Sequence, residues 1–145
     1  MKALLLPVHL VFVGLWLGCV LTEALFERAL LGQGRGNELI LARLHKRVDL
    51  FVEIPSFVMV LFTGGTLLAH TAASPLLHAK VSFALVAIAA NIYCVHLVFR
   101  RERFAANNQW AEFEATDHKQ HKFGAVVLLG MLFALAIGLY LYSGG

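Results

Sequence analysis

The stretch PVHLVFVGLWLGCVLTEALFER, residues 7–28, is apolar enough to cross a membrane, yet it carries His9, Trp16 and Glu23 at intervals of seven residues. Seven residues make nearly two turns of an α-helix, so the three side chains lie within about 40° of one another on one helical face. A histidine and a glutamate are costly to expose to lipid. The spacing therefore predicts a membrane helix that turns this face toward other helices.

The composition of the 145-residue chain is that of an integral membrane protein. Hydrophobic residues make up 59% of it and charged residues 14%, and the mean hydropathy is +0.75. A membrane-spanning helix needs roughly 20 apolar residues. Four stretches reach or approach that length: about residues 3–26, 50–69, 79–99 and 123–142. We therefore expect an all-α fold, an integral membrane four-helix bundle of up-down-up-down topology that forms one domain over residues 1–145.

Residues between the spans indicate where two helices begin. Asn37 is an N-cap candidate for a helix that continues straight into the second span. Ser74 is followed by Pro75, the pair expected at the N-cap and first position of the third helix. The connections are short, as expected for antiparallel neighbours.

Charged residues predict the orientation in the membrane. Ten of the 12 Lys and Arg residues lie on the side that holds the two longer connections, and only Lys2 and Lys80 lie on the other. The positive-inside rule then places both termini outside. In a bacterium this describes a multi-pass protein of the inner (plasma) membrane with periplasmic termini. The basic residues suit anionic membrane lipids, and no nucleic-acid-binding motif is present.

The outer half contains basic groups but no carboxylate, because all nine Asp and Glu residues fall in the inner half. Lys80 either extends to the membrane surface or binds an anion from outside the chain: a lipid phosphate, a partner subunit or a porphyrin propionate. His9 either makes a hydrogen bond to a backbone carbonyl or ligates haem b. His70 and His78 lie on the same side, and either could be the second axial ligand. Trp16 would then separate the haem ligand from the inner half.

Carboxylate and imidazole groups gather at the inner end of every predicted helix. They are Glu23 and Glu27 in the first, His45, Asp49 and Glu53 in the second, His96 in the third, and Asp117, His118 and His121 in the fourth. Helix bundles hold metals with such groups. A non-haem metal ion would take its ligands from Glu23, His45, Asp49, Glu53, His96 and His121. The alternative is a set of headgroup-level salt bridges, which we favour for Asp49 and His118; the basic partners would be Arg43, Lys46, Arg47, Arg100 and Lys122. His96 also shares a helical stripe with His78, as in a bundle with two haems.

Three segments resemble a known family: HLVFVGLW (residues 9–16), EIPSFVMVLFTGG (53–65) and LLHAKVSFALV (76–86). They look like the first three helices of the four-helix bacterial membrane protoporphyrinogen IX oxidases and of the related copper-resistance protein D membrane domain. The resemblance implies that His9 and Lys80 are the residues important to activity and haem binding. The chain has Asn91 where the oxidases usually have a histidine.

Together these features predict a haem b-binding membrane redox protein. It would pass electrons from a hydrophobic substrate to a quinone or a partner protein, and porphyrinogen oxidation is the most specific version. One alternative is a membrane protein that handles copper or iron at the inner site, where carboxylates beside imidazole favour iron, manganese or zinc over Cu(I). Another is an accessory subunit whose polar stripe only fixes assembly. A homo-oligomer or a larger membrane complex is consistent with each.

Overall fold

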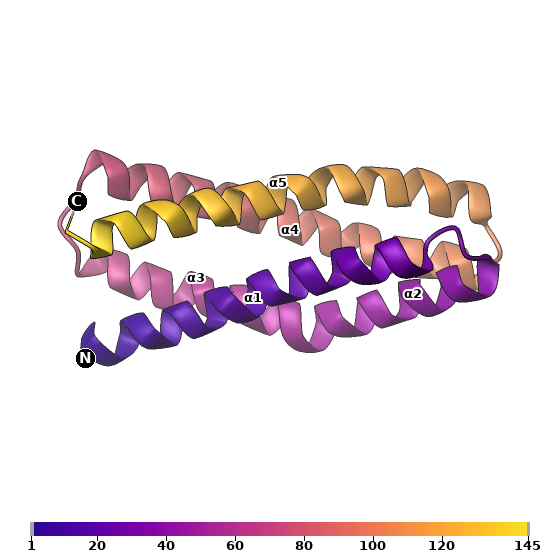
Figure 1. Ribbon diagram of the computed structural model, residues 1–145, viewed down its shortest axis with the longest axis horizontal. Coiled ribbons are helices and arrows are strands. Elements are labelled where there is room, and N and C mark those ends of the chain that lie inside the picture. Colours follow the sequence, from indigo (N-terminus) through magenta and orange to yellow (C-terminus); the bar gives the residue numbers. More distant parts are fainter. Residues whose placement is uncertain (1, 145) are drawn as a thin grey trace.

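Four helical rods run side by side along the molecule in the computed structural model, which describes residues 2–144 and the side chains of residues 4–144 (Figure 1). Met1 and Gly145, the ends of the predicted domain, and the Lys2 side chain lie outside the described part. The first rod is α1 (Lys2–Leu30), and the second joins α2 (Arg35–Val48), η1 (Asp49–Glu53) and α3 (Ile54–Ala69). The third is α4 (Pro75–Ala106) and the fourth is α5 (Trp110–Tyr142).

The rods alternate in direction. The α1–α2 and α4–α5 connections lie at one end of the molecule, and the α3–α4 connection lies at the other end with both termini (Figure 1). In residues 2–144 all four rods are long and apolar enough to cross a membrane. The predicted all-α, up-down-up-down membrane bundle is therefore confirmed.

The helices extend beyond the predicted spans, because polar residues continue them. The predicted second helix begins earlier than expected: Gly34, with φ of 102°, precedes it, and Asn37 lies inside α2 with its amide donating to the Gln33 carbonyl at 3.0 Å. The predicted N-cap at Asn37 is therefore wrong. Gly34 has a positive φ, which favours glycine, and it ends the α1–α2 connection before Asn37 is reached. Ser74 caps α4 as predicted, and its hydroxyl accepts from the Leu77 N–H at 3.2 Å.

A single π-helical turn interrupts the second rod at η1. Pro55 has no N–H, and its ring would clash with the carbonyl four residues before it in a regular α-helix. The wider turn accommodates the proline, and the Ile54 N–H donates to the Asp49 carbonyl five residues earlier. Asp49 and Glu53 are the first and last residues of η1, and both are buried.

Buried side chains recur about every seven residues along the helices. His9, Trp16 and Glu23 are only 7%, 2% and 7% exposed, which confirms that their face turns inward. The buried stripe of α4 advances by alternate steps of four and three, through Ala87, Asn91, Cys94, Val98, Arg101 and Ala105. Near the middle, Trp16 packs on Phe57 with ring centroids 6.0 Å apart, and both belong to one buried apolar cluster with Val60, Ile88 and Met131. This cluster separates the outer polar groups from the inner ones.

Candidate functional site

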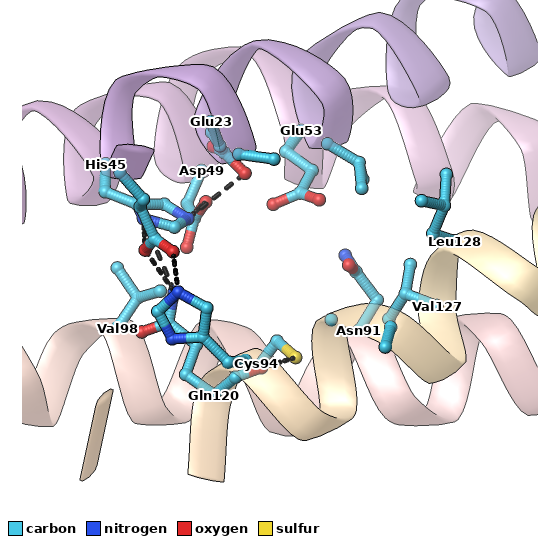
Figure 2. Close-up of a pocket in the computed structure, with 16 residues that line it drawn as sticks. Glu23, His45, Asp49, Glu53, Asn91, Cys94, Val98, Gln120, Val127 and Leu128 are labelled. Atoms are coloured by element: carbon cyan, nitrogen blue, oxygen red, sulfur yellow. Dashed lines mark hydrogen bonds and ion pairs between the residues drawn. The ribbon is translucent and has the colours of Figure 1, made fainter. Parts of the chain in front are cut away.

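A cavity of about 240 Å³ lies in the inner half of the bundle, and residues of all four rods line it (Figure 2). Glu23 comes from α1, His45 from α2, Asp49 and Glu53 from η1, and Asn91 from α4. In Figure 2, Glu53 and Asn91 face each other across the cavity, and His45 lies between Glu23 and Asp49 at one end. The inward stripes of four helices thus bring together polar groups that are distant in sequence.

Glu23, His45 and Asp49 form what we call the first triad. Nε2 of His45 is 3.1 Å from Oε2 of Glu23 and 3.7 Å from Oδ1 of Asp49. One ligand-type atom from each residue lies within 4.8 Å of the other two, and all three residues are buried. Two carboxylates and one imidazole at this separation match the first coordination shell of a small divalent cation.

Several carboxylate oxygens of the first triad lack hydrogen-bond partners. Within the described residues, Oε1 of Glu23 and both carboxylate oxygens of Asp49 accept no hydrogen bond. Asp49 is only 1% exposed. A buried carboxylate without hydrogen bonds or a counter-ion costs several kcal/mol, so such groups are usually paired or coordinate metals.

Glu27, Asp117 and His121 form a second triad beside the first. This triad already holds a cation, the fully buried guanidinium of Arg101. Nη1 of Arg101 donates to Oε1 of Glu27 at 2.7 Å and also to the Asp117 carboxylate. His121 approaches the other side of Glu27, with Nε2 2.7 Å from Oε2.

The two triads meet at His45. Its Nδ1 lies 3.0 Å from Nη2 of Arg101 and 3.3 Å from Oε1 of Glu27. Arg101 can only donate, so with Arg101 bonded the Nδ1 atom accepts and the proton sits on Nε2, facing Glu23. Shifting the proton to Nδ1, where Glu27 can accept it, would free the Nε2 lone pair for a metal.

Negative charge exceeds positive charge in this region. The carboxylates of Glu23, Glu27, Asp49, Glu53 and Asp117 surround one guanidinium and two imidazoles. With all five carboxylates ionised, these residues carry net negative charge even when both imidazoles are protonated. The carboxylates of the first triad lack a guanidinium counter-ion, because Arg101 bonds to carboxylates of the second triad only.

His96 is not part of this cluster, contrary to the expectation for a metal or haem ligand. It is exposed and stacks on Tyr93, with ring centroids 6.4 Å apart. Residue 96 lies two positions after Cys94 on the buried stripe, so it points about 200° around the helix from that stripe, away from the cavity. The remaining expected inner ligands, Glu53 and His121, do line the cavity.

The structure does not support the salt-bridge interpretation of Asp49. None of the predicted basic partners bonds to it in the described chain, and Asp49 instead lies beside His45. Lys46 pairs with Glu102 at 2.8 Å. His118 is exposed, as that interpretation expects.

Sequence reasoning missed Arg101, which was counted only among the inner basic residues, and it left Glu27 and Asp117 out of the candidate ligands. The signal for Arg101 was available in its spacing. Arg101 continues the four-and-three stripe that runs through Asn91, Cys94 and Val98. An arginine on an inward stripe requires carboxylates opposite, which Glu27 and Asp117 supply.

The outer residues form no comparable cluster. Nδ1 of His9 is 2.8 Å from Oγ1 of Thr63, and its ring packs so closely on Gly64 that a Cβ there would lie 3.1 Å from Cε1. His70 follows the C-terminus of α3 and His78 lies in the first turn of α4, and both are exposed.

Lys80 is half-buried, and its side chain lies against Gly138 of α5. A Cβ at Gly138 would lie 3.1 Å from Cε of Lys80. No ion pair joins Lys80 to another residue in the described part of the chain.

No protein-family model, curated protein or solved structure matches this chain. The resemblance to the protoporphyrinogen oxidases and the copper-resistance domain therefore stays a prediction.

Proposed function

We propose that the protein is a membrane metal protein that holds one divalent cation in the inner half of its helix bundle. Glu23, His45 and Asp49 are the ligands, and Glu53 at the end of η1 is a further carboxylate that lines the same cavity. The observation that carries the proposal is the set of buried carboxylate oxygens of Glu23 and Asp49 that accept no hydrogen bond in the described chain.

The ligand chemistry favours iron(II), manganese(II) or zinc(II). Carboxylate oxygens with one imidazole suit these borderline and hard ions, whereas Cu(I) prefers thiolates and thioethers. Cys19 and Cys94 are buried thiols outside the ligand set. Binding at Nε2 of His45 would move its proton to Nδ1, which would exchange the hydrogen bond from Arg101 for one to Oε1 of Glu27, 3.3 Å away.

The proposed centre is a resident site and not part of a conducting path. Trp16, Phe57 and Val60 belong to the apolar cluster that closes the cavity toward the outer half. The charge asymmetry of the chain supports a position of the centre on the cytoplasmic side of a bacterial inner membrane.

Metal analysis of the purified full-length protein tests this proposal. We expect one equivalent of iron, manganese or zinc per chain. Asp49→Asn and Glu23→Gln are expected to weaken Mn²⁺ or Zn²⁺ binding by more than about 100-fold, since loss of a merely supporting residue already costs 10–100-fold. Both variants keep side-chain volume and replace a buried carboxylate by a neutral amide, so we expect them to remain folded.

Glu114→Gln is the matched control, because Glu114 is an exposed carboxylate that pairs with Arg35 far from the cavity. Helical circular dichroism and gel filtration check each variant for folding. Wild-type protein that binds none of the three metals, or a folded Asp49→Asn variant with unchanged affinity, would contradict the proposal.

Haem b ligation by His9 is a second candidate, favoured by one feature. The Thr63 hydroxyl donates to the Met59 carbonyl at 2.6 Å, so it accepts from the Nδ1–H of His9 and leaves the Nε2 lone pair for a ligand. The described cavity does not fit a porphyrin: it lies in the other half of the bundle. Its volume of about 240 Å³ is also below the roughly 300–1,000 Å³ of typical sites for larger organic ligands.

A further inference from the structure

We infer that the same cavity takes the hydroxylated head group of a lipid-soluble molecule, of the hydroquinone class, which enters from the bilayer between α1 and α5. This inference rests on the proposed metal centre, which would occupy the carboxylate end of the cavity.

The first observation is the wall between α1 and α5. α1 packs mainly on α3, and α5 packs mainly on α4, so the two helices make little contact with each other. We define the α1–α5 seam by the cavity-lining residues Val20 and Ala24 of α1 and Gly124, Ala125 and Leu128 of α5. These side chains are small or aliphatic, and Ala24 and Ala125 are exposed.

The surroundings of the seam are those of a lipid-facing surface. Leu25 follows Ala24 and is 65% exposed, and Leu129 follows Leu128 and is 55% exposed. Both seam-forming segments belong to helices that are apolar enough to cross a membrane. A molecule entering here therefore comes from among the acyl chains.

The second observation is a pair of amides inside the cavity. Nδ2 of Asn91 and Oε1 of Gln120 have no partner at hydrogen-bond distance among the described residues, although Glu53 faces Asn91 across the cavity (Figure 2). Both amide side chains line the cavity and are at least 95% buried. Nε2 of Gln120 donates to Glu27 at 3.3 Å, which orients Oε1 of the same amide. Buried amide groups are normally hydrogen-bonded.

A metal ion satisfies the carboxylates but cannot satisfy an N–H donor. The Asn91 amide nitrogen and the Gln120 oxygen thus leave one donor and one acceptor for a second ligand. A hydroxyl group both accepts and donates, whereas a quinone carbonyl or an ether only accepts. The cavity therefore favours a hydroxylated ring over its oxidised or alkylated form.

The size of the cavity limits what enters. An apolar cavity of about 150 Å³ is large enough for benzene, so the volume of about 240 Å³ admits one substituted ring. A hydrocarbon tail would extend through the α1–α5 seam into the bilayer.

The test uses the metal-loaded full-length protein in lipid nanodiscs, with decylhydroquinone as the probe and its dimethyl ether as the comparison. We expect the hydroquinone to bind at least about tenfold more tightly than the ether, because the ether leaves the Gln120 acceptor unpaired. Asn91→Leu and Ala24→Phe should each weaken hydroquinone binding at least about tenfold. Leu25→Phe, which places the same aromatic ring on the lipid-facing side, should leave it within twofold.

Metal content is measured on every sample, so that failure of the metal proposal can be distinguished from failure of the hydroquinone proposal. Absence of metal from the wild-type protein contradicts the proposed function. Two outcomes overturn the present inference alone, each with the metal retained. One is equal affinity for the hydroquinone and the ether, and the other is full hydroquinone binding by Asn91→Leu and Ala24→Phe. A dimer that Ala24→Phe converts to monomers would show that a second copy covers the seam, and would also overturn it.

Discussion

Replacing Arg101 by methionine is expected to destabilise the protein by about 3–5 kcal/mol, the usual cost of removing one partner from a buried ion pair. Methionine keeps the unbranched side chain and much of its volume but removes the charge. The variant leaves Glu27 and Asp117 without their guanidinium and takes a hydrogen bond from His45. Arg101 has no exposed surface, so water does not replace these contacts.

The expected loss is large enough to measure by thermal unfolding. At about 2–4 °C for each kcal/mol in a chain of this size, the midpoint should fall by about 6–20 °C. Lys46→Met is the matched control, because the Lys46–Glu102 pair has a similar N···O distance, 2.8 Å, but its side chains are 37% and 18% exposed. Pairs of this kind contribute about 0–1 kcal/mol.

A double-mutant cycle with Glu27→Gln identifies the source of the loss. If Arg101 acts as the counter-ion, Glu27→Gln should cost less in the Arg101→Met background than in the wild type, because the unpaired charge is then removed. The reasoning is refuted if Arg101→Met lowers the midpoint no more than Lys46→Met does.

Two further outcomes are expected. Gly130→Ala should lower thermal stability, with a cost of about 1–3 kcal/mol from overpacking, because its Cβ would lie 3.0 Å from Cβ of Ala87 and 3.1 Å from the Phe83 carbonyl oxygen. Gly14→Ala should be neutral or stabilising, since a Cβ there meets nothing within 4 Å. Equal shifts of the unfolding midpoint in the two variants would contradict the close packing at Gly130. Under the haem proposal, a reduced-minus-oxidised spectrum of protein from haem-replete cells should show Soret, alpha and beta bands that disappear in His9→Ala; a colourless wild-type protein would contradict it.

Much of the candidate site could be predicted from residue spacing. The sevenfold interval of His9, Trp16 and Glu23 placed all three side chains in the interior. His45, Asp49 and Glu53 follow one another at intervals of four and were expected together at the inner end of the second helix, where they line the cavity. These predictions hold because helix geometry alone determines which side chains share a face.

The remaining parts of the site depend on how helices pack against one another. His96 lies at the same depth as suitable ligands, but the rotation of α4 turns it away from the cavity. Arg101 lies on the inward stripe of α4 and meets Glu27 and Asp117 from two other helices, a partnership that no local pattern specifies. The π-helical turn before Pro55, which contains Asp49 and Glu53, was also not predicted from residue spacing.

The sequence by itself therefore determined the membrane class, the four helices, their alternating directions and the inward faces. Composition and periodicity control these features, because a membrane helix must bury its polar side chains against protein whatever its neighbours are. Only the tertiary structure decided which carboxylates obtain a cation. Arg101 reaches the second triad and leaves Oε1 of Glu23 and both carboxylate oxygens of Asp49 without hydrogen bonds in the described chain. That difference arises from the rotation and spacing of four helices, which are set by side-chain packing across the whole bundle.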